Sequence, residues 1–165
     1  MLLVLLAPVA GYGEDFTLAI VVPLKGEIRY INFDSADHEP TFHVVLTNTS
    51  GKDLRIWESW NSWGYFNLSF ELTREDGKMV VVERGPHMWT MNGTTYWMMK
   101  PGDLHIFDVW FPDDWSDLPN AAKKAEAVKL RAVFSSPASK DSEKLGVWSG
   151  TVKSPEVAVT LQDMR

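Results

Sequence analysis

The sequence predicts an all-β domain whose antiparallel strands form a two-layer sandwich with one short helical connection, and a closed β-barrel is the competing architecture. Hydrophobic and polar residues alternate with a period of two along most of the chain, which is the pattern of half-buried strands. Turn residues separate these runs, and the alternation of strands with long helices that a parallel sheet requires is missing. The chain has 165 residues, of which 45% are hydrophobic and 23% are charged, as is typical of one folded domain.

Each predicted strand is a short run of alternating or β-branched residues that stops at turn residues. The clearest run is residues 65–74, where Phe66, Leu68, Phe70 and Leu72 alternate with polar residues. A strand with this pattern buries one face and exposes the other. The predicted strands are residues 16–22, 41–47, 53–57, 65–74, 79–83, 104–111, 128–134, 146–153 and 156–161.

Only one segment has the composition of a helix. Residues 121–127 (AAKKAEA) are good helix formers, and Asn120 before them is a favourable N-cap. We expect this helix to connect two strands. Residues 135–144 (SSPASKDSEK) are polar and contain a proline, which predicts a flexible hairpin loop.

The chain begins with an apolar run, residues 1–10 (MLLVLLAPVA). This run is too short to span a bilayer, which takes about 20 residues, but it has the length of the hydrophobic part of a signal peptide. Small residues at Ala10 and Gly13 suit cleavage before Glu14, although no Lys or Arg precedes the run, and a first strand of the fold is the alternative. We expect a signal peptide at residues 1–13, one domain at residues 14–165, export to the periplasm or the exterior, and no membrane span in the mature chain.

The composition excludes several functional classes. The chain has no Cys, which excludes a disulfide scaffold, a thiolate zinc site and a cysteine nucleophile. The net charge of −6 argues against a non-specific nucleic-acid binder. The sequence contains no nucleophile elbow, no zinc-protease motif and no phosphate-binding or dinucleotide-binding glycine loop. We therefore expect a protein that is not an enzyme and that needs no cofactor.

Turn and core patterns give the chain a resemblance to a known class of proteins. Residues 47–54 (TNTSGKDL), 101–103 (PGD), 130–134 (LRAVF) and 147–157 (VWSGTVKSPEV) resemble segments of bacterial secreted immunoglobulin-like domains. The resemblance covers about residues 40–161. It implies an immunoglobulin-like or fibronectin-like sandwich and an exported protein, and it brings no catalytic residues. A weaker likeness to small immunoglobulin-like proteinase-inhibitor domains, without a matching reactive loop, makes inhibition an alternative function.

Tryptophan is unusually abundant, with eight residues in the chain. Trp110 and Trp148 lie in predicted strands and are expected to pack in the core, and Trp115 lies in an acidic turn. Exposed Trp rings bind sugar faces or anchor protein interfaces, whereas the alternative for each ring is packing in the core or at its corners. We expect a binding site for a protein or glycan partner at one end of the sandwich, formed by Trp57, Trp60, Trp63, Tyr65, Trp89 and Trp97.

A second cluster combines imidazole and thioether groups. Together these ligands suit Cu(I), and the residue types resemble those of small periplasmic copper carriers. The alternative is that the Met side chains fill the core and a loop. The residues of this alternative Cu(I)-handling site are His87, Met88, Met91, Met98 and Met99. A third possibility is a purely structural module of an envelope assembly.

Overall fold

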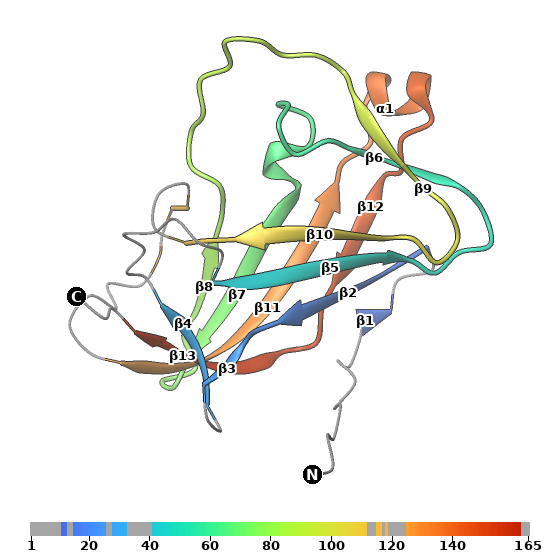
Figure 1. Cartoon of the computed structure of the whole chain (residues 1–165). Helices are drawn as coiled ribbons and strands as arrows, with labels where there is room; N and C mark the ends of the chain where they lie inside the picture. Colours follow the sequence, from blue (N-terminus) through green and yellow to red (C-terminus); the bar gives the residue numbers. More distant parts are fainter. Residues whose placement is uncertain are drawn as a thin grey trace.

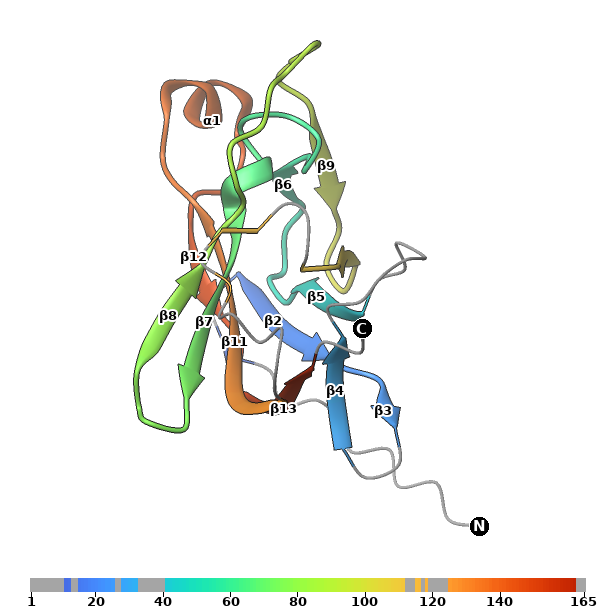
Figure 2. The same cartoon turned by 90° about the vertical axis from the view of Figure 1, so that its left-hand side faces the viewer.

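The computed structural model describes residues 11–12, 15–25, 28–32, 41–111, 115–116, 118 and 125–162. Its strands form two sheets that face each other across a hydrophobic core (Figure 1, Figure 2). The predicted all-β sandwich is therefore confirmed. Within the described part, both strand orders run from one edge strand to another, so the sheets are open and the closed alternative is not formed.

The first sheet has four strands, and every neighbouring pair is antiparallel. Its residues alternate as predicted, because Phe42, Val44 and Leu46 of the third strand are fully buried and the residues between them are half-buried. The order is β1-β2-β5-β10, with β1 at Gly11–Tyr12, β2 at Phe16–Val21, β5 at Phe42–Asn48 and β10 at Leu104–Val109.

The second sheet has seven strands and is mixed, because β4 and β13 run parallel. Its longest strand, β11, pairs with β7 along one side and with both β12 and β13 along the other. The order along the sheet is β3 (Leu24–Lys25), β4 (Ile28–Asn32), β13 (Val157–Gln162), β11 (Glu126–Ser136), β7 (Leu68–Arg74) and β8 (Met79–Val82), with β12 (Gly150–Lys153) beside β11.

A β-bulge separates β12 from β13. The register of their pairing with β11 shifts by one residue between the two strands. Pro155 has no N–H to donate at this point. Ser154 compensates, because its Oγ accepts the Ala132 N–H at 2.9 Å and its own N–H donates to the Ala132 carbonyl at 2.9 Å.

A two-stranded ladder continues β5 and β10 beyond a corner. β6 (Leu54–Trp57) follows β5 in the chain, and β9 (Tyr96–Met99), its antiparallel partner, precedes β10. Asn48 stabilises the corner from a fully buried position, since its Nδ2 donates to the carbonyls of Lys52 and Met99, each at 2.9 Å. The corner places β6 and β9 at the end of the sandwich where the helix lies (Figure 1).

Aromatic rings connect the two sheets. The ring of Phe42 in the four-stranded sheet lies 5.4 Å from that of Phe70 in the seven-stranded sheet. Phe111 contacts both, at 5.1 Å and 5.2 Å between centroids, and Trp115 lies 5.0 Å from Phe70. All four residues are buried, so these edge-to-face contacts form the centre of the core.

A second aromatic group lies further along the sheets. Trp148 contacts Phe16 of β2 edge-on at 5.1 Å and stacks on Phe134 of β11 at 6.0 Å. Its indole N–H donates to Asp15 Oδ2 at 3.1 Å. The expected packing role of Trp148 is therefore seen, and this ring bridges the two sheets.

The outer face of the seven-stranded sheet carries ion pairs. Glu71 on β7 contacts Lys153 and, at 3.2 Å, Arg131, and Arg131 also lies 3.3 Å from Glu156. The hydrogen bond from Lys153, followed by the charges of both cations and the bond from Arg131, holds the pKa of Glu71 below its usual value. These charged side chains allow the outer face of the sheet to contact water.

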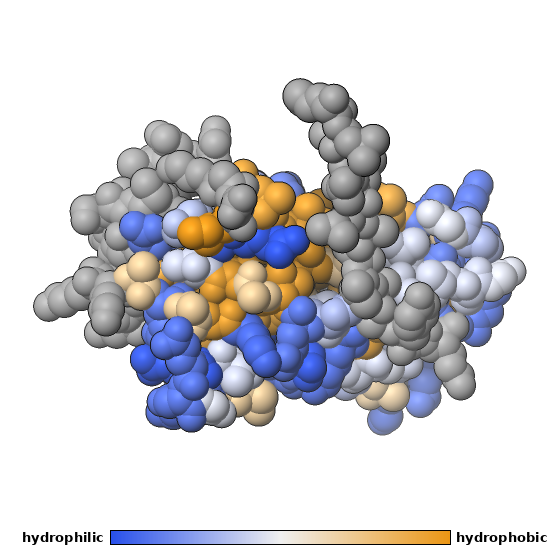
Figure 3. Space-filling model, turned by 90° about the horizontal axis from the view of Figure 1, so that it is seen from below, coloured by the Kyte–Doolittle hydropathy of each residue, from blue (hydrophilic) through white to orange (hydrophobic). Residues whose placement is uncertain are grey.

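Hydrophobic residues gather on another side of the molecule, which Figure 3 shows from below. Strands β2, β3 and β4 lie at this side in Figure 1. Their residues Val21, Leu24 and Ile28 are 41%, 61% and 46% exposed.

The described helix is not where the sequence predicts one. Glu126 and Ala127, the end of the predicted 121–127 helix, are the first residues of β11, and residues 121–124 lie outside the described part. Pairing with β13 draws this end of the segment into the sheet and overrides its helix propensity.

The loop predicted at residues 135–144 is also wrong. Its first residues extend β11, and α1 (Lys140–Leu145) begins within it. Ser139 and Ser142 form a reciprocal capping box at the N-terminus of α1, and Gly146 ends the helix with φ of 63°. These cap signals outweigh the polar, proline-containing composition.

Other boundaries differ from the prediction. Residues Tyr65–Asn67 form a 3₁₀ turn (η1) instead of the start of β7, so Phe66 points outwards and is 51% exposed. The prediction lacks β3, β4 and β9, since β3 has only two residues and the other two runs do not alternate clearly. Of the predicted signal peptide, only Gly11 and Tyr12 are described, and they form β1. Among the described residues, no helix has the length and apolarity that a membrane crossing needs.

We expect Phe70→Ala to lower the free energy of unfolding by about 3–5 kcal/mol, since it removes a buried ring that contacts Phe42, Phe111 and Trp115. Urea denaturation followed by circular dichroism measures this change. Ser69→Ala, on the outer face of the same strand, is the control and should stay within about 0.5 kcal/mol of wild type. Equal losses in the two variants would contradict the proposed centre of the core.

Candidate functional site

Two loops meet at the end of the sandwich beyond β6 and β9. The first, residues 58–67, connects β6 to β7, and the second, residues 83–95, connects β8 to β9. Hydrogen bonds join them directly: Asn92 Oδ1 accepts the Ser62 N–H at 3.1 Å, and Asn92 Nδ2 donates to Ser62 Oγ at 2.7 Å. The fold thus brings together the two aromatic segments of the sequence.

Asn61 is the centre of this connection and is fully buried. Its Nδ2 donates to the carbonyl of Thr95 at 3.0 Å, across the two loops. Its Oδ1 accepts the N–H groups of Trp63 and Gly64 at 3.1 Å and 3.0 Å, which closes the turn. Gly64 is required here, because a Cβ at this position would lie 2.3 Å from the Glu58 carbonyl oxygen.

The three tryptophans of the first loop have different surroundings. Trp57 is 3% exposed, and its ring lies 6.0 Å from that of Trp63. Trp63 is half-buried and donates its indole N–H to Asp141 Oδ2 in the first turn of α1 at 3.0 Å. Trp60 is 49% exposed, and its N–H donates to Glu58 Oε2. Of the three, Trp60 is the ring presented to solvent.

Glu58 holds Trp60 in this position. The same Oε2 also accepts the hydroxyl of Thr95 at 2.8 Å, and the Glu58 N–H donates to the Thr95 carbonyl at 3.2 Å. Both loops therefore orient the carboxylate that orients the indole.

Contacts between aromatic rings and a guanidinium fix the start of the second loop. Tyr65 lies 5.0 Å from His87 and 5.3 Å from Trp89, and the last two rings are 4.6 Å apart. The guanidinium of Arg84 lies over Tyr65 at 5.1 Å and over Trp115 at 4.4 Å. Because Trp115 belongs to the core, these contacts connect the second loop to the core.

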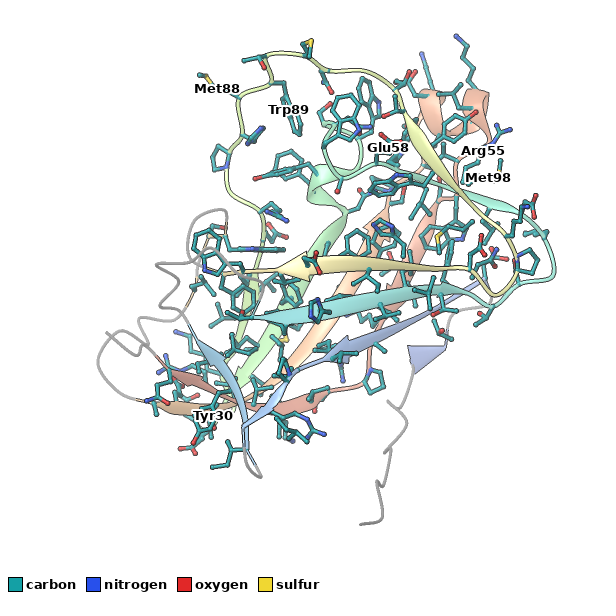
Figure 4. The ribbon with its side chains drawn as sticks, viewed as in Figure 1. Tyr30, Arg55, Glu58, Met88, Trp89 and Met98 are labelled. Carbon is teal, nitrogen blue, oxygen red and sulfur yellow. The ribbon has the colours of Figure 1, made fainter. Side chains whose placement is uncertain are left out.

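Two methionines of this loop are almost fully exposed. Met88, which points away from the rest of the molecule in Figure 4, is 91% exposed, and Met91 is 82% exposed. Ring contacts on one side and the Asn92 bonds on the other nevertheless fix the loop. Phe66, 51% exposed, packs edge-on against Tyr65 at 4.9 Å. We call the surface formed by the exposed and half-buried side chains of these loops the aromatic end; it comprises Trp60, Phe66, Met88, Trp89 and Met91.

Trp97, the remaining residue of the expected site, lies apart from this surface. It is half-buried on β9 and stacks on His105 of β10 at 4.1 Å. His105 also meets the ring of Phe107 at 4.5 Å. Burial lowers the pKa of His105, and the charge of Asp108 opposes this shift in part.

Of the five residues of the expected Cu(I) site, His87, Met88 and Met91 share the second loop, whereas Met98 and Met99 lie on β9. Met99 is 3% exposed in the core, and its neighbour Met98 is 45% exposed. Met88 and Met98 lie on opposite sides of the upper end in Figure 4. No group of three or more His, Asp or Glu side chains suited to a metal ion occurs in the part of the chain that the structure describes.

Sequence reasoning missed the polar residues that position the aromatic end. Glu58, Asn61, Arg84 and Thr95 act through contacts between the two loops, which no local pattern reveals. The spacing of Asn61 and Gly64 is the one signal that could have indicated a closed turn between the tryptophans.

Comparisons with known proteins identify no relative of this chain. No family model matches the chain, and neither a search of curated proteins nor a search of solved structures found a match.

We expect Asn61→Ala to loosen the aromatic end, because the Trp63 N–H would lose its partner, and the Gly64 N–H and the Thr95 carbonyl would each lose one of two partners. The free energy of unfolding should fall by about 1–3 kcal/mol. Hydrogen exchange, measured by mass spectrometry, should become faster in residues 58–64 and 92–95. Asn92→Ala, at an exposed position, should cost less, and exchange that is unchanged by Asn61→Ala would rule out its role as the connecting residue.

His105 should make stability depend on pH. Because burial lowers its folded-state pKa below 6.5, the unfolded chain takes up the proton first as the pH falls. The stability from neutral His105 is therefore complete above about pH 6.5 and is lost as the pH falls towards the folded-state value. Urea denaturation between about pH 8 and pH 5 should show a steeper loss for wild type than for His105→Phe, which keeps a ring but does not titrate. Parallel curves would contradict the assignment.

Proposed function

We propose that this chain is an exported, non-enzymatic binding module that recognises a protein partner through the aromatic end. The observation that carries the proposal is the exposure of Met88 and Met91 on a loop that both flanks hold in place. Side chains that are 91% and 82% exposed gain little from the fold, whereas burial against a partner would remove this apolar area from water.

The chemistry of the aromatic end favours a protein over a glycan. Methionine side chains are flexible and polarizable, and they adapt to apolar partner surfaces. Trp60 and Phe66 add large rings with few rotatable bonds, which lowers the entropy lost on binding. The indole N–H of Trp60 is already bonded to Glu58, so this ring offers a partner mainly its apolar faces.

Export is supported by the sequence of the N-terminus. The ten apolar residues at positions 1–10 and the small residues that follow are suited to a signal peptide. The mass of the protein recovered from the exported fraction of the source cell tests this, since cleavage before Glu14 removes residues 1–13.

A photo-crosslinking amino acid at Thr90, which is exposed between the two methionines, should capture the partner in the source cell. With the captured protein purified, we expect wild type to bind it and the double variant Met88→Ser, Met91→Ser to bind about tenfold more weakly or worse. Calorimetry measures both affinities. Met79→Ser, 56% exposed on β8, is the matched control and should bind as wild type does.

Two results would overturn the proposal. Equal affinity of the double variant and wild type would remove the aromatic end from the interface. Binding of the chain to a glycan array that is lost in Trp60→Ala and retained in the double methionine variant would replace the protein partner with a carbohydrate.

A further inference from the structure

Methionine supplies all the sulfur in this protein, because the chain has seven Met and no Cys. Thiolates normally react first with two-electron oxidants such as peroxides. Without them, the thioethers are the groups in this chain that such oxidants convert reversibly. Which thioethers react then depends on their exposure.

The described methionines differ strongly in exposure. Met88 and Met91 are 91% and 82% exposed, Met79 and Met98 are 56% and 45% exposed, and Met99 is 3% exposed in the core. Among the methionines that the structure describes, the two most accessible thioethers are thus three positions apart on one loop of the aromatic end.

Oxidation at these two positions would change the surface and leave the fold intact. Neither side chain belongs to the hydrophobic core, whereas Met99 does. The loop is held by the contacts of His87 with Trp89 and of Asn92 with Ser62, in which neither Met side chain takes part. A sulfoxide there adds a polar oxygen that must lose its water when an apolar partner covers it.

We propose that Met88 and Met91 form a reversible oxidation site that switches the aromatic end from an apolar to a polar surface. The sulfur of each thioether attacks one oxygen of hydrogen peroxide, so that an S–O bond forms and the O–O bond breaks. The released hydroxide then removes the proton from the new S–OH group and leaves as water. Sulfur loses two electrons in this step. Methionine sulfoxide reductases return them from dithiol and release the oxygen as water. The inference rests on the proposed function, since the switch matters only if the aromatic end binds a partner.

The folded, full-length protein is treated with hydrogen peroxide, and peptide mass spectrometry follows each methionine over time. We expect Met88 and Met91 to oxidise about threefold faster than Met79 and Met98 or more, and Met99 to oxidise last. Immobilised phenyl groups serve as the probe of surface apolarity. Retention on a phenyl column should decrease after oxidation and recover after treatment with both epimer-specific sulfoxide reductases and dithiothreitol.

Matched variants assign the change in retention. In Met88→Leu, Met91→Leu the apolar side chains remain but cannot be oxidised at these positions, so peroxide should reduce retention much less over the time in which Met88 and Met91 of wild type oxidise. Met79→Leu should respond as wild type does. The inference is overturned if Met79 or Met98 reacts as fast as Met88 and Met91, or if the double variant loses as much retention as wild type. Both measurements use no partner, so failure of the proposed function, seen as unchanged partner affinity in the serine variants, is distinguished from failure of the switch.

Discussion

The contact between aromatic rings of the two sheets is the interaction on which the rest of the structure depends. The chain has no cysteine, so no disulfide joins the layers of the sandwich. Instead, Phe42, Phe70, Phe111 and Trp115 interlock edge to face at one place, and Trp148 bridges Phe16 and Phe134 at another. Such pairs contribute about 0.5–1.5 kcal/mol each beyond the burial of their area. These contacts hold the two open sheets against each other.

The same packing extends to the surface. Trp115 contacts the core on one side and the guanidinium of Arg84 on the other, and Arg84 in turn lies over Tyr65. Tyr65 holds Trp89, which neighbours the exposed Met88. The aromatic end is therefore packed continuously onto the interior. The buried and half-buried rings beneath its exposed side chains are already ordered before a partner binds. Binding a partner would not require these rings to become ordered, which lowers the entropic cost of association.

The alternation of hydrophobic and polar residues correctly predicted the strands that have one face in the core and one in water. Strands β5, β7 and β11 alternate strictly, because one face meets the core and the other meets water, and the sequence shows this directly. Sequence patterns failed where pairing with a distant strand determines the secondary structure, as at Glu126 and Ala127. They also failed at α1, where capping residues determine it. For the site, residue types indicated the two aromatic segments, but the exposure of each ring depends on neighbours distant in the chain. Trp57 and Trp60 are three positions apart, yet one is buried and the other is half exposed.

The parallel pairing of β4 with β13 has a consequence for folding. β13 lies between β4 and β11, so the N-terminal hairpin of β3 and β4 has no place in the sheet until nearly the whole chain is present. Contacts this distant in sequence carry a large loop-closure cost and form slowly. A nascent chain can form the β7–β8 hairpin early, but it completes the seven-stranded sheet only after β13 has been synthesised. The β3–β4 hairpin and β13 therefore join the sheet together, late in folding.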